Sequence, residues 1–156
     1  MIYQWFLNKV ALCTNNNYSQ MRFLRNKEKT INILKKNIKE KDAKGLDLTL
    51  VKLFHLGVDK DFTEILLNLL EEDWHLQEEN IVELLGIIKD PRSIDKLYEL
   101  AINIPDYDDM RALAKKCMWA LSAIGTPNAK EKLCLLAKND DGIIKENAIF
   151  QIINLH

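Results

Sequence analysis

Apolar residues recur through this chain at the spacing of a helix, and they rarely alternate with polar residues as they do in a strand. Two stretches in the second half show the pattern best, and each follows a proline. Their apolar positions lie three or four residues apart: Ile94, Leu97, Leu100 and Ala101 in the first, and Leu133, Leu136 and Ala137 in the second. This spacing places the apolar side chains on one face of an amphipathic helix. Only five glycines and three prolines occur, nearly all at expected helix ends, so the sequence predicts an all-α fold of about eight helices.

Two similar segments of the sequence, Leu85–Leu97 and Leu121–Leu133, lie 36 residues apart. Pro91 and Pro127 cannot continue the helix before them, and proline suits the first turn of the helix that follows. Asp90 and Thr126, one residue earlier, are favoured N-caps. A weaker copy lies upstream at Leu53–Asp61. Each copy therefore predicts a helix, a sharp turn and a second helix, and repetition at a fixed period predicts that such hairpins stack on one another.

The residues around the two prolines resemble the HEAT-repeat family in its short bacterial form. In that family the second helix of a pair commonly ends Ala-Leu-Gly-x-Ile-Gly-Asp-Pro, and the matching stretches here are Leu84–Pro91 and Ala120–Pro127. Lys89 and Gly125 occupy the position where the earlier helix ends. The resemblance covers residues 43–156 and implies a HEAT-like α-solenoid, with residues 1–42 forming N-terminal capping and basic helices of the same single domain, 1–156. Solenoids usually present binding surfaces.

The N-terminal stretch Ile2–Cys13 is apolar but is interrupted by Lys9, and it is too short to span a bilayer. We expect it to be a capping helix over the end of the stack. Three scattered cysteines, Cys13, Cys117 and Cys134, lie on apolar faces without a Cys-x-x-Cys pair. We therefore expect reduced core thiols, no metal site and a cytoplasmic location.

The overall charge of −1 hides three blocks of different sign. Residues 1–60 hold 12 basic and 5 acidic residues, residues 61–109 hold 3 and 14, and residues 110–156 hold 7 and 4. The basic residues between Arg22 and Lys44 are typical either of a solvated helix face or of a nucleic-acid footprint. The acidic block beside them argues against nucleic acid, because it would repel phosphate.

The acidic block exceeds what helix capping requires, so it is either a solvated surface or the docking site of a basic protein. Some members have an expected structural role, since Asp106 and Asp108 lie where a new helix starts. The candidate protein-binding carboxylates are Glu79, Glu83, Asp106, Asp108 and Asp109.

Trp119 breaks the repeat pattern. Aligning the copies places Trp119 against Glu83 and against Val51 upstream, and second helices of such pairs line the inner surface of a solenoid. Trp119 is therefore either packed on a neighbouring helix or exposed as an aromatic anchor for a partner, since tryptophan is favoured at interface hot spots. Trp74 and Tyr107, in turns between helices, are further candidates of the same kind.

No catalytic motif is present: the sequence has no Gly-rich phosphate loop, no Gly-x-Ser-x-Gly and no His-Glu-x-x-His. We expect no catalytic residues and no cofactor. By analogy of fold, the expected function is that of a bacterial immunity protein that neutralises a cationic toxin by covering its active site. The alternatives are a nucleic-acid binder of the HEAT-like DNA glycosylase type, which Trp119 near Asp108 resembles, and a scaffold or assembly subunit.

Overall fold

The computed structural model describes residues 26–103 and 108–154 of this 156-residue chain. The predicted capping helix at Ile2–Cys13 lies outside the described residues, as do Cys13, Asp106 and Tyr107. The chain divides into two compact units between Thr49 and Leu50. The prediction of a single domain stays a prediction.

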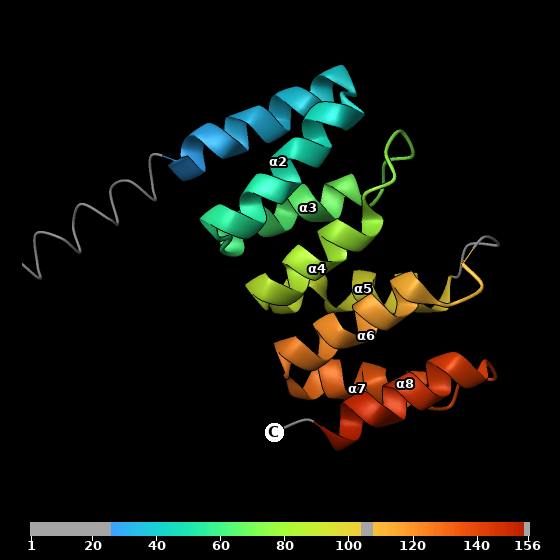
Figure 1. Cartoon of the computed structure of the whole chain (residues 1–156). Helices are drawn as coiled ribbons and strands as arrows, with labels where there is room; N and C mark the ends of the chain where they lie inside the picture. The colour runs from blue at the N-terminus through green and yellow to red at the C-terminus, as the bar shows by residue number, and fades with distance from the viewer. Residues whose placement is uncertain (1–25, 104–107, 155–156) are drawn as a thin grey trace, which may run out of the picture. The chain divides into compact units, whose positions relative to one another are not determined.

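The first unit contains the helical residues 26–40 and the first half of α2, Ala43–Leu56 (Figure 1). Asp42 Oδ1 accepts a hydrogen bond of 2.9 Å from the backbone N–H of Gly45 and so caps the start of α2. The buried Asn37 side chain donates to Thr49 Oγ1 at 3.0 Å. This bond ties the two helices of the unit together. Its lysines lie on the outside: Lys29, Lys35, Lys36, Lys39, Lys41 and Lys44 are all exposed.

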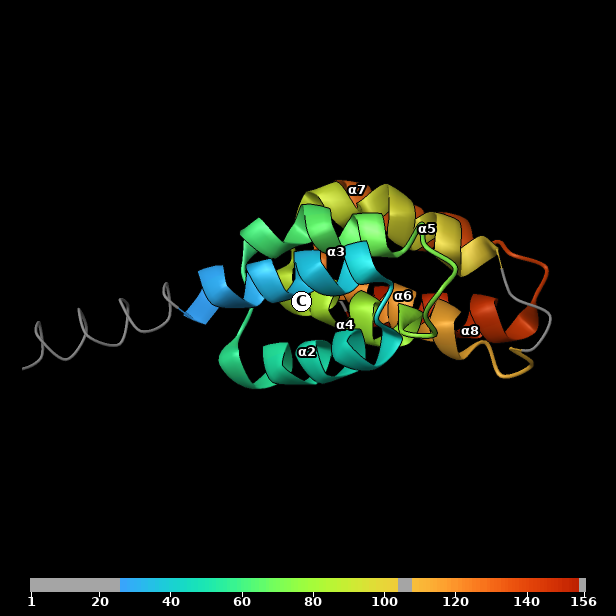
Figure 2. The same ribbon diagram turned by 90° about the horizontal axis from the view of Figure 1, so that it is seen from above.

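The second unit consists of helices joined by short turns. Its α-helices after α2 are α3 (Thr63–Leu69), α4 (Glu78–Ile88), α5 (Ile94–Ile102), α6 (Ala112–Ile124), α7 (Pro127–Leu136) and α8 (Gly142–Ile153), with single 3-10 turns at Lys60–Phe62 and Pro91–Ser93. Figure 2 shows α3, α5 and α7 in one layer and α4, α6 and α8 in the other, and α5 contacts α7 while α6 contacts both α4 and α8. With no strand and eight α-helical segments among the described residues, the all-α prediction is confirmed.

The two repeated corners have the predicted geometry. Asp90 and Thr126 are extended N-caps whose side chains accept backbone N–H groups, and Pro91 and Pro127 open the turn or helix that follows. The preceding helices α4 and α6 end at Lys89 and Gly125, which are both in the left-handed conformation with φ of 56° and 66°. The copies are therefore equivalent in backbone, although only one of them has glycine at the left-handed position.

Leucine and isoleucine side chains fill the space between the two layers. Ile94, Leu97, Ala101, Leu133 and Leu136, which belong to the predicted apolar stripes, are all buried. The expectation that the cysteines are core thiols is only half right. Cys117 is buried, and its burial raises the pKa of the thiol, whereas Cys134 is exposed because it lies on the outward face of α7, next to the buried Leu133.

A buried carboxylate organises the first corner. The Asp90 side chain accepts from Thr63 Oγ1 at 3.0 Å and from the Arg92 backbone N–H at 3.0 Å and Nε at 2.9 Å. Arg92 also donates to the carbonyl oxygen of Lys60 at 2.9 Å. The hydrogen bonds from the Arg92 side chain are the main reason that the pKa of Asp90 falls to about 2 from an ordinary 3.8. This corner is thus joined to the start of α3 through charge-assisted bonds.

We predict that Asp90→Asn lowers the free energy of unfolding by about 1–2 kcal/mol at neutral pH, because it removes charge-assisted hydrogen bonds from a buried group. The folded pKa is depressed, so this stabilisation is complete above the unfolded pKa of 3.8 and is lost as the pH falls toward 2. Urea titrations of both proteins at several pH values measure it. Asp95→Asn, at a carboxylate that is 83% exposed, is the control and should change stability little. The prediction would be contradicted if the free energies of unfolding of Asp90→Asn and of the unmodified protein still differed at low pH.

Candidate functional site

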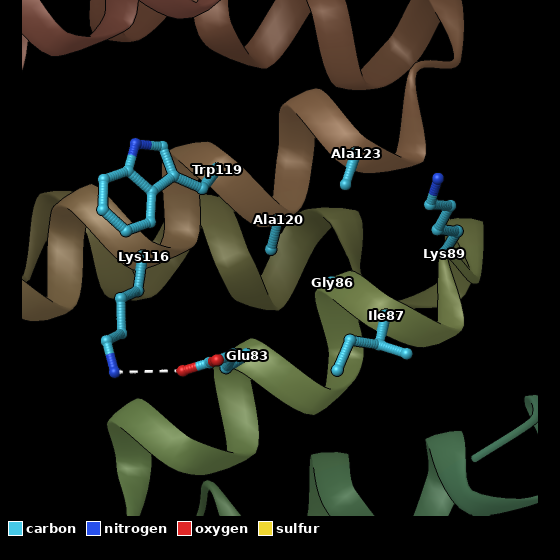
Figure 3. A pocket seen from close by; sticks show the side chains of 8 residues that line it. All are labelled: Glu83, Gly86, Ile87, Lys89, Lys116, Trp119, Ala120 and Ala123. Atoms are coloured by element: carbon cyan, nitrogen blue, oxygen red, sulfur yellow. Dashed lines mark hydrogen bonds and ion pairs between the residues drawn. The ribbon is translucent and has the colours of Figure 1, made fainter. Parts of the chain in front are cut away.

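A groove lies between α4 and α6 on the face of their layer (Figure 3). It has a volume of about 460 Å³. Four lining residues come from α6, namely Lys116, Trp119, Ala120 and Ala123. The other four are Glu83, Gly86 and Ile87 of α4 and its C-cap Lys89. The groove therefore joins the two positions, Glu83 and Trp119, that the repeat alignment had placed side by side.

Small residues allow the two helices to approach closely along this groove. A Cβ atom added at Gly86 would lie 3.2 Å from both Cα and Cβ of Ala120, which is tighter than ordinary contact. Gly86 therefore has no room for a side chain toward α6, and glycine here serves close helix packing. Ala120 and Ala123 lie opposite, so the small residues of both helices leave the middle of the groove open.

Trp119 is exposed. Its exposed fraction is 54%, whereas the neighbours Met118 and Ala120 are buried in the same helix. The sequence left open whether this indole packs on a neighbouring helix or faces solvent, and the structure supports the exposed alternative. Val51, the upstream residue of the aligned set, is also exposed. Ile87 adds a second large apolar side chain on the α4 side of the groove and is half exposed.

Lys116 bridges two of the predicted carboxylates at the Trp119 end of the groove. Its Nζ lies 3.3 Å from Glu79 Oε2 and 3.2 Å from Glu83 Oε2, and Figure 3 shows it reaching across from α6 to Glu83. Burial on its own would lower the pKa of Lys116, but the hydrogen bonds to Glu83 and Glu79 outweigh it and the pKa is raised. The three groups together carry a charge of −1.

Other carboxylates of the acidic block are paired in the same way. Lysines of later helix pairs reach back to acids of the preceding pair, as shown by Lys96 with Glu71 at 2.5 Å and Lys132 with Asp95 at 2.9 Å. Lys96 also pairs with Glu99 of its own helix. Part of the acidic block is therefore paired with lysines of this chain, and Lys116 and Lys132 come from outside the block. The distribution of charge along the sequence did not indicate these pairs.

Asp108 acts as a helix cap and is not free to bind a partner. Its two carboxylate oxygens accept the backbone N–H groups of Ala112 at 2.8 Å and Leu113 at 3.2 Å, at the start of α6. The side chain is buried, and its hydrogen bonds are those of the expected cap. Asp109, the next residue, is exposed. A glycosylase-like pairing of Asp108 with Trp119 is not formed, because Asp108 lines a different hollow of about 630 Å³ together with Leu76, Glu78, Glu79, Asn80 and Leu113.

Trp74 has a structural role in the turn before α4. Its Nε1 donates to Glu72 Oε2 at 2.8 Å, and its ring meets the ring of His75 edge to face, with centroids 5.0 Å apart. His75 is buried, with Nε2 2.9 Å from the carbonyl oxygen of Leu69 and Nδ1 accepting from the Gln77 backbone N–H at 3.2 Å. The neutral tautomer with its proton on Nε2 satisfies both contacts. Trp74 is thus a weaker candidate for binding than Trp119.

Among the large side chains that line the groove, sequence reasoning missed Ile87, Lys89 and Lys116. Ile87 follows Glu83 by four residues and therefore shares its helix face, so the helical spacing contained that signal. Lys116 precedes Trp119 by three residues, but its pairing with two glutamates of another helix has no local sequence signature. Lys89 was identified as a helix end and not as a lining residue.

Neither a metal-ligating cluster nor a membrane span is found in the described ranges. No group of three or more His, Cys, Asp and Glu side chains there is close enough to hold a metal ion. Among the same residues no helix has the length and hydropathy needed to cross a bilayer. Comparison with protein-family models, with curated proteins and with solved structures gave no match to this chain.

Proposed function

We propose that this chain is a HEAT-like α-solenoid that binds another protein through the groove between α4 and α6 and performs no catalysis itself. The observation that carries the proposal is Trp119, a large aromatic side chain 54% exposed beside a groove of small residues. A large apolar ring left in solvent is unfavourable unless it gains contacts elsewhere, and tryptophan is enriched among the residues that dominate binding energy.

The partner carries a basic surface. Several acids of the same block, outside the lining of the groove, form no ion pair with the residues that the structure describes, among them Asp73, Glu78 and Asp109. The cluster of Glu79, Glu83 and Lys116 adds a further negative charge beside Trp119. Such a surface attracts cationic proteins and speeds their association.

The role we assign to this binding is that of a bacterial immunity protein in the cytoplasm, which neutralises a cationic toxin by covering its active site. The support is an analogy of fold together with the acidic surface, because many toxins are cationic nucleases that such a surface would hold. A nucleic-acid binder is disfavoured by the same acidic side chains, and Asp108 has its carboxylate occupied by the cap of α6.

The test uses the full-length protein as bait, with Trp119→Ala as a parallel bait and Phe150→Ala, an exposed aromatic of α8 outside the groove, as the matched control. We expect a partner that binds the unmodified protein and Phe150→Ala but does not bind Trp119→Ala. The complex should weaken as salt is raised to about 1 M, where charges are screened beyond roughly 3 Å. Co-expression should protect cells from that partner.

Three results would contradict the proposal. A complex indifferent to salt argues against electrostatic recognition. A partner retained by Trp119→Ala moves the binding surface away from the groove. Retention of duplex DNA in a filter-binding assay at about 0.15 M salt favours the nucleic-acid alternative, for which a steep salt dependence is expected.

A further inference from the structure

The groove between α4 and α6 carries opposite charges at its two ends. At the Trp119 end, Glu79 and Glu83 share the single ammonium group of Lys116 through one oxygen each. Both glutamate side chains are about half exposed, at 50% and 51%. An incoming cation can therefore reach these carboxylates while it lies against the indole, which attracts cations over its face.

At the opposite end stands Lys89, beside Ala123 (Figure 3). Its side chain is exposed and forms no ion pair with any residue that the structure describes. Its backbone is left-handed with φ of 56°, a conformation that disfavours any residue with a Cβ atom and that Gly125 adopts freely at the equivalent corner. Arg111, which has the same backbone conformation, uses its charge to bind Asp141. Lys41 shares the conformation as well, so it is the place of Lys89 at the rim of the groove that makes its charge available to a ligand.

The middle of the groove is apolar. Ile87 forms one side, half exposed, and Gly86, Ala120 and Ala123 leave the space beside it open. Glu83 and Lys89 are six residues apart on or just beyond one helix, which corresponds to about 9 Å along its axis. An extended chain covers this distance in about three residues.

We infer that the groove binds a short extended segment of the partner protein in a fixed polarity. An arginine of the segment stacks on Trp119 and pairs with Glu83, an apolar side chain enters beside Ile87, and a carboxylate about three residues from the arginine pairs with Lys89. This inference rests on the proposed function and names the segment that the groove recognises. The charges at the ends, rather than the apolar middle, decide which segments are accepted.

The probe is the blocked peptide Ser-Arg-Ser-Leu-Glu-Ser, added to full-length protein labelled with nitrogen-15. Indole N–H signals are recorded by NMR, and the signal of Trp119 among the three tryptophans is assigned by its loss in Trp119→Phe. We expect the peptide to shift this signal. Replacing its Arg by Gln, or its Glu by Gln, should weaken binding by about threefold each, as expected for exposed ion pairs.

Substitutions in the protein identify which peptide end lies where. Glu83→Gln should weaken binding of the original peptide but not binding of the peptide that lacks Arg. Lys89→Ala should weaken binding of the original peptide but not binding of the peptide that lacks Glu. Lys89→Glu should prefer a peptide in which Glu is replaced by Lys. The matched controls are Glu146→Gln and Lys130→Ala, exposed residues on α8 and α7 outside the groove, which should bind as the unmodified protein does.

Lys89→Gly separates the effect on binding from the effect on folding. It should raise the midpoint of thermal unfolding and at the same time weaken binding of the peptide. If the peptide shifts the Trp119 signal but neither end substitution matters, the polarity is wrong and the proposed function stands. If no peptide moves the signal at millimolar concentration, this inference is overturned, and the partner experiment with Trp119→Ala decides the proposed function separately.

Discussion

Leu121→Ala should lower the free energy of unfolding by about 3–4 kcal/mol, whereas Trp119→Ala, two residues away in α6, should lower it by no more than about 1.5 kcal/mol. The reason is the difference in burial. Leu121 is fully buried, so truncation leaves a cavity between the layers, while Trp119 has an exposed fraction of 54% and borders an open groove. Urea unfolding followed by circular dichroism measures both values.

The comparison between the two variants is also a test of the binding surface. A loss of several kcal/mol in Trp119→Ala would mean that the indole is part of the core, and the groove would then lose its anchor. Equal losses in both variants would have the same meaning. Ile149→Ala, a partly exposed apolar residue of α8, is a useful reference for a substitution at the surface and should change stability little.

Gly86→Val should lower the free energy of unfolding by about 2–3 kcal/mol, because it overpacks the contact between α4 and α6. Its Cβ alone would lie 3.2 Å from Cα and Cβ of Ala120, and the two further methyl groups have no space on that side. The helices must separate to admit the side chain, so the groove also changes shape. Chemical denaturation gives the stability, and the indole N–H signal of Trp119 reports the change in the groove.

Gly142→Ala is the control for this substitution. Nothing lies within 4 Å of a Cβ atom built at Gly142, which is the first residue of α8 after its N-cap Asp141. Alanine should leave stability unchanged or raise it by up to about 1 kcal/mol, since glycine loses more conformational freedom on folding. A Gly86→Val protein as stable as Gly142→Ala would show that the helices are not as closely packed as the structure describes.

The sequence predicted the corners of the fold because their signals are local. Proline after Asp90 and after Thr126 leaves few conformations for the turn, and the structure has both as N-caps. The alignment of Glu83 with Trp119 was also informative, because equivalent positions in stacked hairpins face the same side. The alignment therefore predicted that these two residues lie on one surface, and both line the groove.

Other features of the site depend on contacts between distant residues, and the sequence could not supply them. The acidic block was consistent with a solvated surface or with a docking site, and neither alternative foresaw that Lys116 and Lys132 of the next block pair with acids of the helices before them. Asp108 was weighed both as a cap and as a binding residue, and only the hydrogen bonds to α6 show that it is a cap. Cys134 was expected on an apolar face, but it follows the buried Leu133 by one residue, points about 100° away from it around the helix and is exposed.

The lysine bridges between consecutive helix pairs all run in one direction, with the base on the later pair and the acid on the earlier one: Lys96 to Glu71, Lys116 to Glu79 and Glu83, and Lys132 to Asp95. Each of these bridges sets the lysine side of one hairpin against the acidic side of the hairpin before it, whereas Arg111 and Asp141 pair in the opposite sense. Two hairpins exchanged in a permuted gene would therefore again place lysines opposite carboxylates, but a hairpin turned over would place like charges against each other. Charge thus favours one orientation of neighbouring hairpins and does not fix their order.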